Sequence, residues 1–242
     1  MAITEDKQKQ KNMKLFYDNS NYYEDAGHNF VDVRNTYKKN LLKNVFSIYS
    51  PKKGEKVADL GCGWGNVSLE LQGRGFDVTS LDYSYKSIDI CKKTATKLGL
   101  DPSKFFCRDA TDTRFGGASF DLVYCVDFVE HIYSSVYEDL LREVYRILKA
   151  GGKFIIYTPN PSHIFEILKK NNIVLKKDIS HVDYKTMARL RQSLIRRGFH
   201  IEKAFYMESH VPVFSILERH LMRYIPIFRR RNAVLAIRKN DL

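Results

Sequence analysis

The stretch VADLGCGWG, residues 57–65, decides how the rest of the chain is interpreted. A short apolar run ends in an acid, Asp59, and is followed by glycines at positions 61, 63 and 65. This pattern is typical of a buried strand that turns sharply into a helix beneath a ligand, because glycine tolerates positive φ angles and lets a ligand approach the bare backbone. The helix that follows would offer free N–H groups and the positive end of its dipole.

The spacing of these glycines separates two classes of ligand. The order is G-x-G-x-G, whereas dinucleotide-binding enzymes carry G-x-G-x-x-G. A carboxylate at Asp59 would repel a pyrophosphate but can accept a hydrogen bond from an ammonium group. The pattern therefore favours a zwitterion that carries a nucleoside, and S-adenosylmethionine fits that description.

Length and composition set the broad class of the protein. The 242 residues, 44% of them hydrophobic, suit one large α/β domain or a domain with a cap. No apolar run is long enough to span a membrane, and the polar N-terminus lacks a signal core, which predicts a cytoplasmic location. The net charge of +12 implies attraction to acidic partners. Four separated cysteines, at 62, 91, 107 and 125, predict free and mostly buried thiols.

Beyond residue 50 the hydrophobic pattern alternates between strands and helices. Near-continuous apolar strands such as 120–125 indicate a parallel sheet that is buried on both faces. The predicted strands are 56–60, 76–81, 104–108, 120–125, 153–158, 200–207 and 233–237, and the predicted helices are 65–73, 84–98, 134–148, 184–197 and 213–224.

The N-terminal 50 residues are predicted to form a helical cap on a main domain of residues 51–242. Residues 1–14 are interpreted as a mobile, charged lead, and the tyrosine-rich stretch up to Phe30 as either an irregular cap or a lid over the ligand. A helix is expected over 32–49 because it carries an apolar stripe at helical spacing.

Acidic residues follow three further predicted strands. Asp82 comes 21 positions after Gly61, where an acid accepts from ribose hydroxyls in doubly wound sheets. Asp109, with Ala110, lies where an adenine amino group could donate to it, and Asp127 follows the fourth strand. Because the carboxyl ends of parallel strands meet at one rim, we expect a single ligand site there. The cofactor-binding prediction comprises Asp59, Gly61, Gly63, Asp82, Tyr83, Asp109, Ala110 and Val126.

Five segments of the chain together resemble the class I S-adenosylmethionine-dependent methyltransferases over residues 30–240. These segments are VADLGCGWG, LDYS, CRDATD, FDLVYCVDFVEHI and LREVYRILKAGGKFIIYTPN. The segments DFVEHI, TPNPSHIFEILKKNN and SHVDYKTM are similar to the O-methyltransferases of ubiquinone biosynthesis. The resemblance implies a Rossmann-like doubly wound α/β sheet of seven strands, mostly parallel with the last antiparallel.

The resemblance also implies roles for particular segments. An insertion after the fifth strand, 161–180, is associated in that group with membrane contact and substrate entry. In that group an arginine before the glycine loop holds the methionyl carboxylate, and Arg34 is the best match; a solvated surface arginine is an equal alternative.

The basic amphipathic segment 213–231 is interpreted from its own residues as a core-covering helix. The alternative is an interfacial anchor whose arginines meet anionic headgroups.

Asp127, Glu130 and His131 form a candidate metal site. If the segment is helical, the three side chains share one face and could hold Mg²⁺, Mn²⁺ or Zn²⁺. The quinone-pathway enzymes carry a similar motif, usually with Glu in place of Asp127. Support of the rim without a metal is the alternative, and His131 could then act as the base. His181 is a second candidate base, although a surface histidine beside a helix is the favoured interpretation.

Three other functions are less consistent with the sequence than methyl transfer to a small molecule. Tyr145 and Lys149 imitate a short-chain reductase motif, but Lys149 is expected on the far side of its helix. A nucleic-acid methyltransferase is not expected, because the N/D-P-P-Y/F turn is missing after the fourth strand, and a non-catalytic cofactor-binding module is the third rival. The sequence thus predicts a methyltransferase for a small molecule, with O-methylation of a phenolic or quinone-precursor acceptor leading and N- or C-methylation, lipid or RNA as alternative acceptors. Peripheral contact with an anionic membrane is left open.

Overall fold

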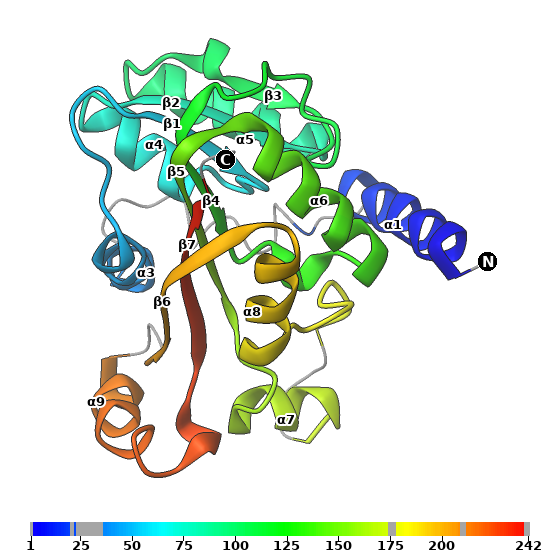
Figure 1. The fold of residues 1–242 in the computed structure, drawn as a ribbon, viewed down its shortest axis with the longest axis vertical. Helices are drawn as coiled ribbons and strands as arrows, with labels where there is room; N and C mark the ends of the chain where they lie inside the picture. Colours follow the sequence, from blue (N-terminus) through cyan, green and yellow to red (C-terminus); the bar gives the residue numbers. More distant parts are fainter. Residues whose placement is uncertain (1, 20–21, 23–35, 174–177, 209–211, 240–242) are drawn as a thin grey trace.

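A seven-stranded sheet in the order β3-β2-β1-β4-β5-β7-β6 forms the centre of the molecule (Figure 1). The computed structural model describes residues 2–19, 22, 36–173, 178–208 and 212–239. The strands are β1 Lys56–Leu60, β2 Asp77–Asp82, β3 Phe105–Cys107, β4 Phe120–Val126, β5 Leu148–Pro159, β6 Phe199–Met207 and β7 Arg231–Arg238. The pairs β5–β7 and β7–β6 are antiparallel and the other four are parallel, so the predicted α/β class and mostly parallel sheet are confirmed.

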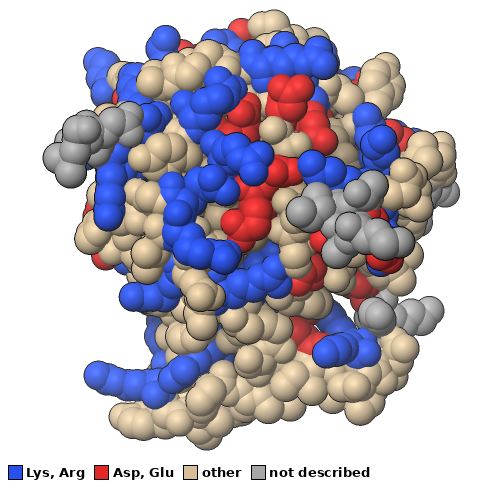
Figure 2. Space-filling view, turned by 45° about the vertical axis from the view of Figure 1, so that its right-hand side comes forward, with Lys and Arg blue, Asp and Glu red and all other residues tan. Residues whose placement is uncertain are grey.

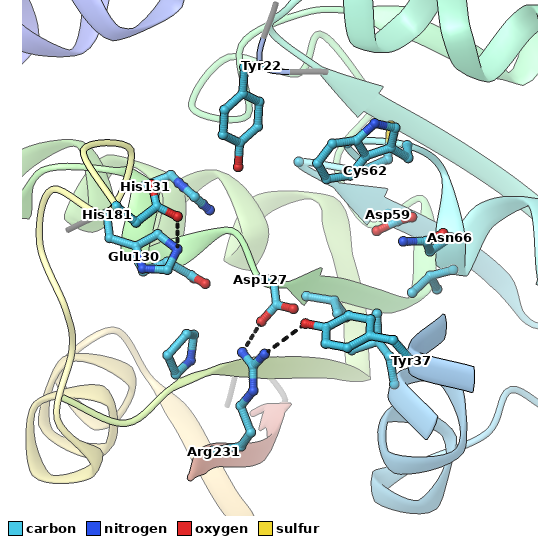
Figure 3. A pocket seen from close by; sticks show the side chains of 18 residues that line it. Tyr22, Tyr37, Asp59, Cys62, Asn66, Asp127, Glu130, His131, His181 and Arg231 are labelled. Carbon is cyan, nitrogen blue, oxygen red and sulfur yellow. Dashed lines mark hydrogen bonds and ion pairs between the residues drawn. The ribbon is translucent and has the colours of Figure 1, made fainter. Parts of the chain in front are cut away.

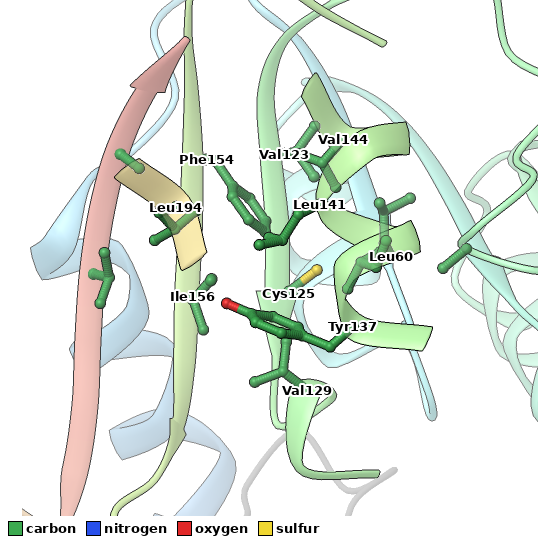
Figure 4. Packing of buried hydrophobic residues seen from close by; sticks show 14 of the residues in the cluster. Leu60, Val123, Cys125, Val129, Tyr137, Leu141, Val144, Phe154, Ile156 and Leu194 are labelled. Atoms are coloured by element: carbon green, nitrogen blue, oxygen red, sulfur yellow. The ribbon is translucent and has the colours of Figure 1, made fainter. Parts of the chain in front are cut away.

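Helices cover both faces of this sheet. One face packs against α3 (Thr36–Ile48) and α4 (Asn66–Gly73), and the other against α6 (Ser134–Ile147) and α8 (Met187–Arg196). Helix α5 (Tyr85–Lys97) packs with α4 and β3 in a smaller cluster. Consecutive strand residues alternate between the faces: Leu122 and Tyr124 contact the first layer, and Val123 and Cys125 the second (Figure 4). Burial on both faces explains why these strands are almost continuously apolar.

The start of β5 differs from the prediction by five residues. The Gly151–Gly152 pair suggests a helix-to-strand turn, yet the strand already begins at Leu148, which pairs with Phe120. Gly151 has a φ of 73°, and the register with β4 shifts between Phe120 and Leu122. The glycines therefore lie within an irregular first part of the strand, where a positive φ is accommodated without ending it.

The prediction of a mobile lead over residues 1–14 is wrong. Residues Ala2–Asn19 form a helix, α1, which packs against α6 and α5. Asp18 accepts from the Ser84 hydroxyl at 2.8 Å and from the Tyr85 N–H at 3.0 Å, at the first turn of α5. Much of this docking is polar, and a helix of this kind shows no strong apolar stripe for sequence reasoning to detect.

A separate group of short elements lies beyond the carboxyl end of β5: α7 (Ile164–Lys170), α9 (Pro212–Leu221) and the 3₁₀ turn η3 (Pro226–Phe228) (Figure 1). Helix α9 buries Glu218 and leaves Ile216 63% and Leu217 50% exposed. The favoured prediction of a core-covering segment is therefore wrong for Leu217, Tyr224 and Ile225, which are exposed; the side chains of residues 213 and 214 lie outside the described part of the chain. None of the helices in the described ranges combines the length and apolarity needed to cross a bilayer.

The arginines at 229–231 do not form an outward basic turn. Arg230 forms an ion pair with Glu166 of α7, and Arg231 forms one with Asp127 after β4. The Arg229 Nε donates to the Met222 carbonyl at 3.1 Å. The alternative, in which these arginines meet anionic headgroups, does not fit Arg230 and Arg231, because each already forms an ion pair with an acid of this chain.

Candidate active site

The glycine loop after β1 has the strained backbone that its sequence predicts. Gly61, Gly63 and Gly65 all have positive φ angles, of 71°, 52° and 75°. A Cβ on Gly61 would lie 2.3 Å from the Phe128 ring, whereas a Cβ on Gly63 would meet nothing within 4 Å. Gly61 is thus required by close packing, and Gly63 keeps an open space beside the backbone that a ligand can occupy.

Two buried acids flank this loop. The Asp82 carboxylate accepts from the Gly63 N–H at 3.0 Å and from the Ser84 N–H at 2.9 Å. Asp59 accepts from the Ser68 hydroxyl. Burial raises the pKa of each acid to about 6, although the hydrogen bonds favour the ionised forms.

Three adjoining cavities follow the loop, and Gly61 lines all of them. The largest has a volume of about 340 Å³ and is lined by Asp59, Gly63 and Val126, together with the residues after β4. A second, of about 60 Å³, is lined by Asp82, Tyr83 and Phe128. The third, of about 20 Å³, is lined by Asp82, Tyr83, Asp109, Ala110 and, from α1, Gln10. The predicted cofactor residues within the described ranges therefore all line one connected region; Arg34 lies outside those ranges.

Two histidines and a glutamate gather on one side of the largest cavity (Figure 3). One potential ligand atom from each of Glu130, His131 and His181 lies within 4.8 Å of the others. Glu130 is fully buried; one of its oxygens accepts from Thr158 at 2.9 Å and the other has no hydrogen-bond partner. Burial raises the pKa of Glu130 to about 8 and lowers the pKa of His181 to about 3, the latter with help from neighbouring His131. Burial also lowers the pKa of His131.

His181 is not the surface histidine that the sequence favours. Its side chain is 12% exposed, and it lines the cavity because the neighbouring Val182 and Asp183 N–H groups bond to the Glu130 carbonyl. Its Nδ1 lies 2.7 Å from the Tyr184 hydroxyl, which donates to Glu166 at 2.7 Å. Nδ1 must therefore donate to Tyr184, which leaves Nε2 as the unprotonated nitrogen of the neutral ring.

Asp127 does not belong to the metal-ligand cluster, so that part of the predicted set is wrong. Its carboxylate forms an ion pair with Arg231, whose other Nη lies 3.4 Å from the Tyr37 hydroxyl (Figure 3). The backbone explains the difference: Asp127 has a φ of 49°, and only Val129–His131 form a single 3₁₀ turn. The assumed α-helical face does not exist, so the i, i+3 spacing does not bring Asp127 to Glu130.

Sequence reasoning also missed residues that support this site. Lys185 is fully buried, and its Nζ donates to the carbonyls of Val129, Ile132 and Asp183 at 2.8, 2.5 and 2.7 Å. It therefore holds the 3₁₀ turn that carries Glu130 and His131. No local pattern marks it, since a lysine in the first turn of a predicted helix is ordinarily expected to be solvated.

The rival reductase motif lies elsewhere. Lys149 forms an ion pair with Asp121 at 2.7 Å, near the amino end of β4, and Tyr145 packs on Phe199. Neither side chain lines the cavities around the glycine loop. The prediction of free cysteines is confirmed, with Cys107 exposed and the other three buried.

Comparison with known proteins agrees with this geometry. Residues 58–156 match the methyltransferase domain family. A ubiquinone biosynthesis O-methyltransferase of Coxiella burnetii is 31% identical over 108 residues, 45% of each chain. A sterol 4-C-methyltransferase of Caenorhabditis elegans is 27% identical over 127 residues, 52% of this chain and 36% of that protein. The chain thus spans less than half the length of these two relatives.

The fold itself has counterparts among solved structures. The crystal structure of an S-adenosylmethionine-dependent methyltransferase from Archaeoglobus fulgidus superposes with a TM-score of 0.67, at 20% identity, over 89% of this chain and 99% of that one. At that identity the likeness concerns the fold, while the sequence match covers the glycine loop and the strand ends. Together these findings show a methyltransferase domain over residues 58–156, within a fold that is shared with an S-adenosylmethionine-dependent methyltransferase.

Proposed function

We propose that this protein transfers the methyl group of S-adenosylmethionine to an oxygen atom of a small phenolic or quinone-precursor acceptor. The observation that carries the proposal is the position of His131, a partly buried histidine in the same cavity as the glycine loop. The similarity to ubiquinone biosynthesis O-methyltransferases supports an oxygen acceptor. Aromatic and apolar side chains on the cavity wall, Tyr22, Tyr37, Leu41 and Trp64, suit a ring-shaped acceptor.

The residues along the three cavities suit the parts of the cofactor. Asp82 would accept from the ribose hydroxyls, and Asp109 from the adenine amino group. Asp59 would attract the positive end of the methionyl group. The cavity beside Asp109 has a volume of about 20 Å³, which is room for a water and not for a purine. We therefore expect Phe128, which lines it, to move when the cofactor enters.

The chemistry requires little from the protein beyond positioning and proton removal. When bound, S-adenosylmethionine supplies a methyl group made electrophilic by its sulfonium. His131 is neutral at pH 7 because burial lowers its pKa, and it can therefore receive the proton of an acceptor hydroxyl. The acid-lined wall that includes Asp59 would favour the cationic cofactor over its neutral product.

A metal-assisted variant of this function has its own support. Glu130, His131 and His181 could hold Mg²⁺, Mn²⁺ or Zn²⁺, since the unpartnered Glu130 oxygen needs a counterpart. A metal there would lower the pKa of a catechol hydroxyl. Exhaustive chelation followed by addition of Mg²⁺ or Zn²⁺ tests this: loss and recovery of turnover supports the metal, and full activity in chelator leaves His131 as the base.

The central test is an acceptor screen with methyl-labelled S-adenosylmethionine. The panel contains phenols, catechols, quinone precursors, amines, sterols, lipids and RNA, and we expect label in a methyl ether of a phenol or catechol. His131→Gln should lower the rate by roughly two orders of magnitude, the usual contribution of a general base. Transfer to nitrogen, to carbon or to RNA alone would contradict the proposal.

Peripheral membrane contact is a second part of the proposal, because it would deliver an apolar acceptor. Ile216, Leu217 and Tyr224 are 63%, 50% and 78% exposed. Figure 2 shows that the lower end of the molecule, where α7 and α9 lie, is largely uncharged, with lysines and arginines above it. Co-sedimentation with anionic vesicles should be weakened by the double variant Ile216→Glu, Leu217→Glu, and equal sedimentation of both proteins would refute the contact.

A further inference from the structure

The imidazole of His131 is held by two segments that are far apart in the sequence. Its Nδ1 lies 2.9 Å from the Tyr17 hydroxyl and 3.0 Å from the Ser180 carbonyl oxygen. Tyr17 belongs to α1 and is 3% exposed, and Ser180 precedes α8 and is fully buried. Neither contact involves Asp127, Glu130 or His181.

The Ser180 carbonyl determines which ring nitrogen carries the proton. A carbonyl oxygen can only accept, so a contact of 3.0 Å requires His131 Nδ1 to carry hydrogen. The neutral ring is then unprotonated at Nε2. The Tyr17 hydroxyl must present an oxygen lone pair to the same N–H, because its own proton has no acceptor at Nδ1.

The backbone of His131 is also held by α1. Gln10 Nε2 donates to the His131 carbonyl at 3.2 Å, and Gln10 Oε1 accepts from the Tyr133 N–H at 3.1 Å. Tyr17 and Gln10 lie on the same helix, seven positions apart, which is two helical turns. Helix α1 therefore contacts His131 at both the imidazole ring and the backbone carbonyl.

We propose that Tyr17 is a positioning residue for His131, which acts with the Ser180 carbonyl to fix the tautomer that leaves Nε2 unprotonated. The pair of oxygens does for this histidine what a carboxylate does in a hydrolase triad: it orients the ring and stabilises the N–H that remains when Nε2 takes up a proton. The role of Nε2 as the base rests on the function proposed above. The orientation of the ring does not.

This arrangement couples the docking of helix α1 to the orientation of the His131 ring. Helix α1 lines the small cavities that suit the cofactor, through Gln10 and Tyr17, and it also sets the ring of His131. When α1 moves aside, His131 loses the Tyr17 oxygen and the Gln10 clamp together. Both oxygens hold the ring only while α1 is docked, since the Ser180 carbonyl alone remains when α1 is displaced.

The test compares Tyr17→Phe with Tyr85→Phe in the full-length chain. Tyr85 is 68% exposed on α5 and serves as the matched control. Nitrogen-15 NMR of histidine-labelled protein reports the tautomer of His131, assigned with a His131→Gln sample. We expect Nδ1–H alone in the wild type and in Tyr85→Phe. In Tyr17→Phe, where only the Ser180 carbonyl still holds that N–H, we expect ring exchange or a minor Nε2–H population.

Binding and turnover provide the second readout. Calorimetry with S-adenosylmethionine should give dissociation constants within about twofold for all three proteins, since one hydroxyl at the ring of His131 is removed. Turnover of a phenolic acceptor found in the screen should fall roughly three- to tenfold in Tyr17→Phe at an unchanged KM, the effect of one neutral hydrogen bond.

The outcomes separate this inference from the proposed function. A wild-type His131 protonated at Nε2, or an unchanged spectrum and rate in Tyr17→Phe, overturns the positioning role. If Tyr17→Phe does not fold, the wild-type spectrum still tests the tautomer, because Nε2–H there overturns the positioning role. Should no acceptor be methylated while the spectra differ as expected, the positioning role stands and the proposed chemistry fails.

Discussion

Replacing Asp59 by asparagine should stabilise the protein in a strongly pH-dependent way. Asp59 is 2% exposed, and burial raises its pKa from 3.8 to about 6. A raised folded-state pKa means that the folded chain binds this proton more tightly than the unfolded chain does. The stability contributed by that proton is complete below pH 3.8 and is lost as the pH rises through 6.

The size of the effect follows from the two pKa values. A shift of about two units corresponds to about 3 kcal/mol once both states are ionised, near pH 8. At pH 5, where the folded acid is still mostly protonated, the same relation gives about 1.6 kcal/mol. Asparagine does not ionise, and its amide oxygen can still accept from the Ser68 hydroxyl. The free energy of unfolding of Asp59→Asn should therefore exceed that of the wild type by these amounts.

Urea unfolding at pH 5 and pH 8, followed by circular dichroism, measures the difference between the two proteins. The control is Asp112→Asn, a surface change at a side chain that is 72% exposed, which should stay within about 0.5 kcal/mol at both pH values. A difference that does not grow with pH, or a less stable Asp59→Asn at pH 8, would refute the assignment of a desolvated carboxylate. The gain should come with weaker binding of S-adenosylmethionine, since the site loses a negative charge.

The remaining predictions concern the cofactor seat and the core. Asp82→Ala should raise the calorimetric dissociation constant for S-adenosylmethionine at least tenfold, because each charge-assisted bond contributes about 1.5–3 kcal/mol; an unchanged constant removes Asp82 from the ribose role. Gly61→Ala should lower the melting temperature and abolish binding, since its Cβ would lie 2.3 Å from Phe128, whereas Gly73→Ala, with nothing within 4 Å, should do neither. Leu141→Ala, at a fully buried position of α6, should cost 2–5 kcal/mol in urea unfolding, and a smaller loss would mean that the core around it collapses.

The local part of the site could be predicted from the sequence. The glycine loop and Asp82 lie where the strand ends place them, because the fold brings the carboxyl ends of β1 and β2 to one rim and a short stretch encodes each turn. Three predicted cofactor residues, Asp59, Asp109 and Ala110, line the same connected region for that reason.

The partners of these residues could not be predicted, because they come from distant parts of the chain. Tyr17 meets His131 across 114 positions, Ser180 meets it across 49, and Arg231 meets Asp127 across 104. A single sequence records which side chains are charged and not which charges face each other. The predicted metal-ligand set was wrong for this reason: Asp127 has a carboxylate that could bind a metal, but that carboxylate forms an ion pair with Arg231.

The buried acids of this site have an energetic logic that depends on the ligand. Asp59, Asp82 and Glu130 are almost completely buried, and burial raises the pKa of each, so the ligand-free fold holds carboxyl groups where ionisation is unfavourable. Apolar replacements would make a more stable protein, as they do for many buried charged groups. A cation that enters the site restores part of the lost solvation and favours the ionised forms. The burial that destabilises the ligand-free fold therefore strengthens the attraction of the site for a sulfonium or a metal ion. That attraction weakens when the sulfonium becomes a neutral thioether, which favours release of the product.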